Sequence, residues 1–287
     1  MWGGDKVELC AITPADVPAV ADFLHRELND RVSPTTWAQA MTPPWSTDWP
    51  DHGMFLRHEG EVVGVQLAFY STRELGGNRE RFCNLGAWCV REEHRGSGLR
   101  LLRGLLCRKE YTFTDLSPSG NVVGLNRRLK FVDLDTTTRA VPALPGRPGS
   151  VRVTSDPAEV AREVPDRSRR VYEDHRTCAG AHHVVISDGD RRCYLVFRRD
   201  RRKRLPLFAT VLHVSDPELF ARAAPAVARH VLVRHRVPVL LVEERVAGGS
   251  PRGSLRLGGS RARMFRSDHL GADDVDYLYS ELTCVAW

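Results

Sequence analysis

Hydrophobic and polar positions follow two periods along this chain, and each period predicts a different element. Alternation with a period of two predicts strands, and apolar residues spaced three or four positions apart predict helices. The predicted elements of the first half are, in chain order, strand 7–12, helix 14–28, a short helix ending at 41, strands 54–57, 61–70 and 84–90, a helix starting at 99, strand 111–116, helix 119–129 and strand 131–138. This succession predicts an α/β fold of the α+β kind, with helices packed on a sheet.

After residue 140 the pattern begins again. The stretch 141–150 holds three prolines and two glycines and is predicted to be a linker. Beyond it the predicted strands are 151–153, 183–187, 193–198, 206–214, 239–243 and 278–285, with helices opening at Asp156 and Asp216. We therefore predict two domains, 1–140 and 151–287, of which the second is either a degenerate repeat of the first or an unrelated α/β module.

Composition narrows the class of protein. With 287 residues, of which 42% are hydrophobic, the chain can bury one large core or two ordinary ones. Its seven cysteines are never spaced as C-x-x-C, which predicts neither a zinc site nor a disulfide framework. No run of 18 apolar residues and no N-terminal leader pattern occur, so we expect no membrane partner and a cytoplasmic location.

Charge is distributed unevenly. Residues 1–150 carry 18 basic and 18 acidic side chains, so the whole net charge of +6 falls in residues 151–287. Much of the excess is the run 198–204, which lies between two predicted strands and has no interleaved aromatic residues. That arrangement is typical of a solvated hairpin tip rather than of a nucleic-acid surface, and no nucleic-acid partner is expected.

The chemistry of the first half concentrates between the predicted strand 84–90 and the helix that starts at 99. Gly96 and Gly98 allow backbone N–H groups to turn toward one point, which the positive end of the following helix dipole also faces. Such a cradle suits a phosphate or pyrophosphate. A Walker loop is excluded because Leu99-Arg100 follows the second glycine, and a dinucleotide fingerprint is excluded because Leu101 occupies the position of its third glycine.

The loop and the order of elements together resemble a known family. Arg95 and Gly98 match the Arg/Gln-x-x-Gly-x-Gly/Ala loop of the GNAT superfamily of acyl-CoA N-acyltransferases, with Arg100 replacing its last small residue. The order of elements over 7–138 is also similar to that family, and Leu129-Lys130-Phe131 resembles its Leu-Gly-Phe turn. The resemblance implies a mixed, mostly antiparallel sheet flanked by helices, followed by a second, GNAT-like half that has lost CoA.

The resemblance also implies a co-substrate and its contacts. Acetyl-CoA or another short acyl-CoA is expected, with no metal. Its pyrophosphate would bind the loop residues Arg95, Gly96, Ser97, Gly98, Leu99 and Arg100. Its pantetheine arm would pair with the backbone of Trp88, Cys89 and Val90, where the fourth and fifth strands of the family splay apart and leave backbone groups unpaired. A backbone N–H near Cys89 would then stabilise the oxyanion.

The acid–base positions of the family are replaced in this sequence. Asn84 stands where some members place a catalytic Glu, and Asn126 stands where many place a Tyr. Neither amide accepts a proton at neutral pH, although Asn84 can position a water and Asn126 can bond the thioester sulfur. The remaining explanations are an acceptor of low pKa, a base from elsewhere such as Glu92, His94 or a carboxylate of the second half, or loss of activity.

Two functions of different classes follow. The leading one is an N-acyltransferase, most simply an N-acetyltransferase, acting on a small-molecule amine, for example in secondary metabolism. Trp45 and Trp49, in a proline-rich loop, are candidates for its substrate wall. The second half would complete the acceptor pocket, and a chain ending near Gly149 would then keep CoA binding. The alternative is a non-catalytic acyl-CoA-binding or scaffold protein; the oligomeric state is not predicted.

Overall fold

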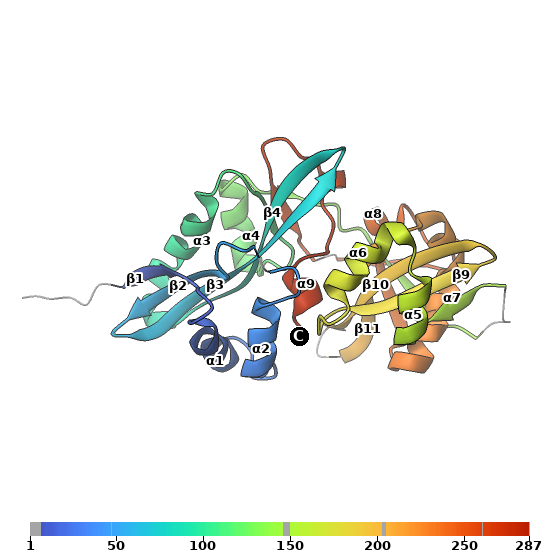
Figure 1. The fold of residues 1–287 in the computed structure, drawn as a ribbon, viewed down its shortest axis with the longest axis horizontal. Coiled ribbons are helices and arrows are strands. Elements are labelled where there is room, and N and C mark those ends of the chain that lie inside the picture. The colour runs from blue at the N-terminus through green and yellow to red at the C-terminus, as the bar shows by residue number, and fades with distance from the viewer. Residues whose placement is uncertain (1–6, 47, 146–149, 203–204, 260, 287) are drawn as a thin grey trace, which may run out of the picture. The chain divides into compact units, whose positions relative to one another are not determined.

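The computed structural model describes residues 7–46, 48–145, 150–202, 205–259 and 261–286. They form two compact units, which are drawn in Figure 1. Unit 1 comprises Met1–Asp133, Arg263–Asp274 and Tyr279–Val285, and unit 2 comprises Leu134–Ala262, Val275–Leu278 and Ala286–Trp287. Each unit has its own sheet.

The sheet of unit 1 has seven strands in the order β1-β2-β3-β4-β5-β14-β6. Their bounds are β1 Glu8–Ala11, β2 Gly53–His58, β3 Glu61–Leu75, β4 Asn78–Val90, β5 Thr112–Asp115, β14 Met264–Arg266 and β6 Val132–Asp133. All neighbours pair antiparallel except β4 and β5, which are parallel. The predicted mixed, mostly antiparallel sheet is confirmed.

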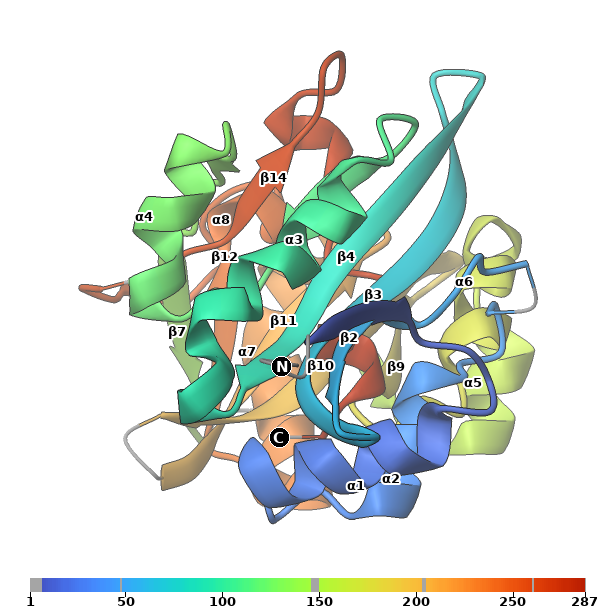
Figure 2. The ribbon, with the colours of Figure 1, turned by 90° about the vertical axis from the view of Figure 1, so that its left-hand side faces the viewer.

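Helices cover both faces of this sheet. They are α1 Val17–Glu27, α2 Pro34–Met41, α3 Gly98–Leu106, α4 Gly120–Arg128 and α9 Glu281–Cys284. Leu102 and Leu105 of α3 pack with Leu85 of β4 and Ala68 of β3, and Figure 2 shows α3 lying across β4. Because strand side chains alternate between faces, Asn84 and Gly86 of β4 point away from α3.

The pairing of strand β4 with β3 is irregular near the end of β4. Its pairing with β3 shifts between Val65 and Leu67, so that two β4 residues, Ala87 and Trp88, lie opposite the single residue Gln66. Ala87 has a φ of 41°, and the buried Gln66 donates from Nε2 to the carbonyl of Gly86 at 3.0 Å. This is a β-bulge, a feature that redirects a strand and that is common beside functional sites.

The sheet of unit 2 repeats the strand order of unit 1. From one edge to the other it runs β8-β9-β10-β11-β12-β7-β13. Its elements are β7 Thr138–Pro142, β8 Arg152–Thr154, α5 Pro157–Glu163, α6 Asp166–His175, β9 His182–Asp188, β10 Arg191–Arg202, β11 Leu205–Val214, α7 Pro217–His235, β12 Val239–Glu243, α8 Glu244–Ala247 and β13 Leu255–Arg256. Among the described strands of unit 2, only β11 and β12 pair in parallel, which matches the position of β4 and β5 in unit 1.

The two sheets exchange one strand each. Strand β14, from the second half of the sequence, lies between β5 and β6 of unit 1, and β7, from the first half, lies between β12 and β13 of unit 2. Contacts therefore divide the chain at Asp133/Leu134, and not at the predicted linker 141–150, of which Val141 and Pro142 belong to β7. The order of elements along the chain does not reveal this exchange, because β14 and β7 occupy the same place in two sheets of the same strand order.

Three predicted elements are wrong in detail. Residues 278–285 form no strand of the second half, because Tyr279–Val285 belongs to unit 1 and carries α9. The predicted strand 131–138 is short, since β6 holds only Val132–Asp133. The helix expected from Asp156 toward His175 is broken into α5 and α6 at Val164-Pro165, where proline disfavours a helical residue before it.

Candidate functional site

The predicted phosphate loop connects the end of β4 to the start of α3. Residues Glu92–Ser97 form a 3-10 helix, and Gly98 begins α3. A side-chain carbon built on Gly96 would meet nothing within 4 Å, and one on Gly98 would lie 3.4 Å from Val90, an ordinary contact. Neither glycine has a positive φ, so the fold itself does not require them. Bare backbone at the first turn of a nine-residue helix leaves room for an anion.

Two arginines flank this turn. The side chain of Arg95 is 69% exposed and bonds Glu92 across 3.2 Å, a pair that solvent screens and that yields readily to a phosphate. Arg100 donates from Nη1 to the carbonyl of Val7 at 2.8 Å. Arg95 is therefore the better placed of the two to bind a pyrophosphate, while Arg100 anchors α3 to the start of β1.

The predicted splay between the fourth and fifth strands is present. Strand β5 pairs with β4 only at Phe82, Cys83 and Asn84. From Leu85 to Val90, the described strands give β4 no partner on that side. The backbone of Trp88, Cys89 and Val90 thus lies on a half-buried edge with donors and acceptors available to an amide-rich ligand.

Asn84 is buried at the point where β4 and β5 separate, and the chain itself uses both ends of its amide. Its Nδ2 donates to the hydroxyl of Thr114 at 3.0 Å, and its Oδ1 accepts from the backbone N–H of Glu281 at 3.0 Å. Oε1 of Glu281 in turn accepts from the Ser117 hydroxyl at 2.8 Å. The structure therefore places Glu281, whose backbone bonds Asn84 and whose carboxylate bonds Ser117, next to the residue predicted for the base.

Asn126 lies on α4, fully buried, and its Nδ2 donates to Oδ2 of Asp115 at 2.8 Å. Its Oδ1 is buried and has no hydrogen-bond partner among the described residues. Burial raises the pKa of the Asp115 carboxyl to about 6, although the hydrogen bonds from Asn126 and from the Ser117 backbone oppose that shift. The position predicted for an acid thus holds an amide joined to a carboxyl that titrates near neutral pH.

The two tryptophans of the proline-rich loop pack against unit 1. Trp45 donates from Nε1 to the carbonyl of Tyr70 at 3.1 Å, and its ring lies 5.1 Å from that of Tyr279. The ring of Trp49 lies 6.0 Å from that of Phe69, and its Nε1 is buried without a partner in the described part of the chain. Both are half-buried, so their role as a substrate wall stays a prediction.

The other bases considered from the sequence lie beyond the end of β4. Glu92 is 82% exposed, and the His94 ring lies 4.8 Å from that of His58. Six strand residues, about 20 Å, separate Asn84 from Val90. Glu92 and His94 are therefore remote from the point where Asn84 and Glu281 meet.

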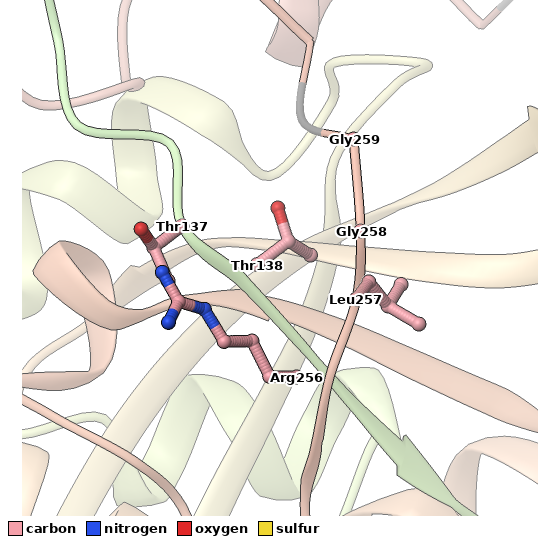
Figure 3. Close-up of a pocket in the computed structure, with 6 residues that line it drawn as sticks. All are labelled: Thr137, Thr138, Arg256, Leu257, Gly258 and Gly259. Carbon is pink, nitrogen blue, oxygen red and sulfur yellow. The ribbon is translucent and has the colours of Figure 1, made fainter.

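The described residues were also compared with the requirements of a metal site and of a membrane-spanning helix, and unit 2 has a hollow of its own. Within the described residues, no group of three or more His, Cys, Asp and Glu side chains could hold a metal ion, and no helix is long and apolar enough to cross a membrane. Unit 2 contains a hollow of about 420 Å³, drawn in Figure 3 and lined by Thr137, Thr138, Arg256, Leu257, Gly258 and Gly259. Among the described residues that line it, Arg256 is the only ionisable one, and these residues offer no acid–base pair.

Known structures with the same arrangement decide the fold. A proposed acetyltransferase from Pyrococcus horikoshii aligns with 99% of this chain and 97% of its own, with a TM-score of 0.57 and 16% identity. GCN5-related N-acetyltransferases from Kribbella flavida and Anabaena variabilis align with 92% and 91% of this chain and 71% and 72% of their own, each with a TM-score of 0.56, at 18% and 12% identity. The chain has the GNAT fold. No family model and no curated protein matches the sequence.

Within this GNAT fold, sequence reasoning missed Glu281, Ser117 and Asp115. Asp115 gave a weak signal. It is an acidic residue at the end of the strand Thr112–Asp115, whose four residues are all buried. Glu281 gave none, because its partner Asn84 is 197 positions away.

Proposed function

We propose that this chain is an acyl-CoA-dependent N-acyltransferase that moves a short acyl group, most simply acetyl, to an amine of a small molecule. The observation that supports this best is the unpaired edge of β4 from Leu85 to Val90, which leads directly into the bare first turn of α3. An edge for an amide-rich arm and a turn for a pyrophosphate, in that order along one strand, suit an acyl-CoA.

In this proposal the pyrophosphate binds at Arg95, Gly96, Ser97, Gly98 and Leu99, and the pantetheine arm pairs with the backbone of Trp88, Cys89 and Val90. A backbone N–H near Cys89, at the end of the bulged segment, stabilises the oxyanion when an amine attacks the thioester carbonyl. Oδ1 of Asn126 has no partner among the described residues and accepts a hydrogen bond from the CoA thiol once the leaving thiolate has been protonated.

The second half of the sequence, in this proposal, is a GNAT-like repeat without CoA. Support comes from the strand order shared by the two sheets. In unit 2 the turn between β11 and α7 reads Ser215-Asp216-Pro217-Glu218, and Arg191 bonds both acids. Two carboxylates at that helix start repel a pyrophosphate, so one CoA per chain is expected.

The test is calorimetric titration of the full chain with acetyl-CoA, followed by a thiol-release assay with a panel of small amines. Gly98→Glu adds a carboxylate at the first turn of α3 and should weaken acetyl-CoA binding at least about tenfold, or about 1.4 kcal/mol. Gly120→Glu, the same change at the first residue of α4, where an added side-chain carbon meets nothing within 4 Å, is the matched control.

Unchanged affinity in Gly98→Glu overturns the assigned loop. Binding of one acetyl-CoA without transfer to any amine favours the alternative function, an acyl-CoA-binding or scaffold protein. The two amides Asn84 and Asn126 at the family's acid–base positions are the observation that keeps this alternative open.

A further inference from the structure

The segment Tyr279–Val285 carries a carboxylate into the sheet of unit 1. Glu281 is 0% exposed, and its helix α9 contacts both α2 and β4. Its backbone N–H is held by Asn84, and its carboxylate by Ser117 in the loop after β5. Glu281 is thus bonded to Asn84 of β4 and to Ser117 of the loop that follows β5, the two strands that separate at the splay.

Strand β4 is shaped to admit this side chain. A side-chain carbon built on Gly86 would lie 3.1 Å from Cβ and 3.5 Å from Cγ of Glu281, and 2.9 Å from the Phe69 ring. Any residue larger than glycine at 86 would therefore push against Glu281. Gly86 pairs with Leu67 of β3 directly before the bulge of β4, and its carbonyl accepts from Gln66. The side chain of Glu281 consequently lies against the same strand segment that leads to Cys89.

We propose that Glu281 is the general base of the acyl transfer, taking the place that the family gives to a Glu at the position of Asn84. The inference rests on the proposed N-acyltransferase function. Asn84 acts as a positioning residue, since its amide holds the Glu281 backbone and cannot itself accept a proton. A buried carboxylate costs free energy, and such costs are concentrated where chemistry needs the group.

The step balances as follows. The amine nitrogen attacks the thioester carbonyl carbon, a C–N bond forms, and the carbonyl electrons move to the oxyanion. The Glu281 carboxylate accepts the proton that the positively charged nitrogen releases. When the intermediate collapses, the C–S bond breaks and the thiolate leaves with the electron pair. The proton passes from Glu281 to the thiolate, which gives amide, CoA thiol and the regenerated carboxylate.

Helix α2 and strand β4 both contact α9, so their ionisable residues bear on the titration of Glu281. Helix α2 carries none in its sequence PTTWAQAM. On β4, Cys83 packs with Leu102 and Leu105 of α3, on the other face of the sheet. Asp115 of β5 bonds Asn126 of α4. Arg73 of β3 lies 5.2 Å from the Tyr279 ring, and Cys284 is the other ionisable residue of α9 itself.

The experiment compares the full wild-type chain with Glu281→Gln, Glu281→Asp and Ser117→Ala. Thiol release is measured from pH 6 to 10 with amines of different pKa, acetyl-CoA affinity by calorimetry, and folding by thermal melting. General bases contribute about 10²–10⁴-fold to rate, so Glu281→Gln should lower kcat at least about 100-fold while acetyl-CoA affinity stays within about twofold. In Glu281→Gln, the apparent kinetic pKa should follow the pKa of each amine.

Glu281→Asp and Ser117→Ala test whether Glu281 acts as a base or only as a buried structural residue. Glu281→Asp keeps a carboxylate that is one methylene shorter and should keep the wild-type form of the pH profile at reduced kcat. Ser117→Ala removes a bond to the charged carboxylate and should raise the apparent kinetic pKa with a smaller loss of rate.

Each outcome decides between defined alternatives. A Glu281→Gln variant with unchanged kcat and pH profile overturns the assignment, as does a Glu281→Asp variant that loses the wild-type pH profile. Loss of acetyl-CoA affinity and of folding in both Glu281 variants assigns the residue a structural role and also overturns it. A wild-type chain that binds acetyl-CoA and acylates none of the amines overturns the proposed function itself, which is a distinguishable result.

Discussion

The backbone N–H of Glu281 donates to Oδ1 of Asn84 across 3.0 Å and joins two residues 197 positions apart. Both residues are buried, and Asn84 is also bonded to Thr114 at the end of the last paired register between β4 and β5. One amide side chain therefore connects three segments of unit 1 at the point where its sheet opens. Asn84 holds the segment Tyr279–Val285 in place.

Asn84→Ala is expected to loosen that segment before it affects the rest of unit 1. The change leaves the buried N–H of Glu281 without its acceptor, which costs about 1–3 kcal/mol. Hydrogen exchange at Tyr279–Val285 should accelerate. The kcat should fall by about one to two orders of magnitude because Glu281 is no longer held in place. Asn84→Asp keeps an acceptor for the N–H and is the control. Equal exchange in wild type and Asn84→Ala would show that the bond does not hold the segment.

Local patterns in the sequence predicted the parts of the fold that local interactions determine. The strand ending at Val90, the turn at Gly98 and the leucine stripe of α3 could be predicted because periodicity and glycine positions act over a few residues. The predicted GNAT fold is confirmed. The residues assigned to CoA remain predictions, since no ligand contact tests them.

The sequence could not predict which sheet receives β7 and β14. Both strands are short and follow similar neighbours, so either sheet satisfies their backbone groups equally well by local criteria. Helix α9 could not be predicted either, because its four residues are too few to show a helical periodicity. The acid–base residues of the site depend on that placement, so the sequence supplied only the general expectation of a carboxylate from the second half.

Truncation is expected to destroy unit 1, which reverses the expectation from the sequence that a chain ending near Gly149 keeps CoA binding. Such a chain lacks β14, which pairs with both β5 and β6, and lacks the Glu281 segment bonded to Asn84. Circular dichroism should show no cooperative melting for residues 1–149. Co-expression with residues 150–287 should restore it, because that fragment supplies both segments. A soluble, cooperatively melting 1–149 fragment would contradict the strand exchange as a requirement for folding.

Unit 2 is expected to lose stability in mild acid. Burial lowers the pKa of His182, His183 and His230 from 6.5 to about 4 in each case. The unfolded chain therefore binds more protons than the folded chain between these values, so stability is complete above pH 6.5 and is lost as the pH falls toward 4. Urea midpoints measured from pH 7.5 to 4 should fall across this window.

A single histidine tests this assignment. His183 accepts at Nδ1 from the Tyr194 hydroxyl (2.8 Å) and donates from Nε2 to the carbonyl of His175 (3.2 Å), so the neutral ring is the bonded form. His183→Gln retains a donor and an acceptor without titrating, and its urea midpoint should depend less on pH. The same pH dependence in wild type and variant would exclude His183 as a contributor.

Asp115→Asn is expected to stabilise unit 1 at neutral pH and to impair the site. The pKa of this carboxyl is raised from 3.8 to about 6, mainly by burial, so the folded chain retains the proton more strongly than the unfolded chain. The free energy of unfolding of the wild type therefore decreases as the pH rises from about 4 to 6. Above pH 7 the buried charge lowers it by the full amount, about 2–3 kcal/mol. The variant avoids this cost. The gain of the variant in free energy of unfolding, measured with urea, should grow between pH 4 and 6 and then level off. Its kcat should fall because Asn126 loses its carboxylate partner.

The control is Asp133→Asn, which removes an exposed carboxylate paired with Arg127. Its free energy of unfolding should differ from that of the wild type by at most about 0.5 kcal/mol at every pH. An advantage of Asp115→Asn that does not change with pH would show that the buried carboxyl does not titrate in this range.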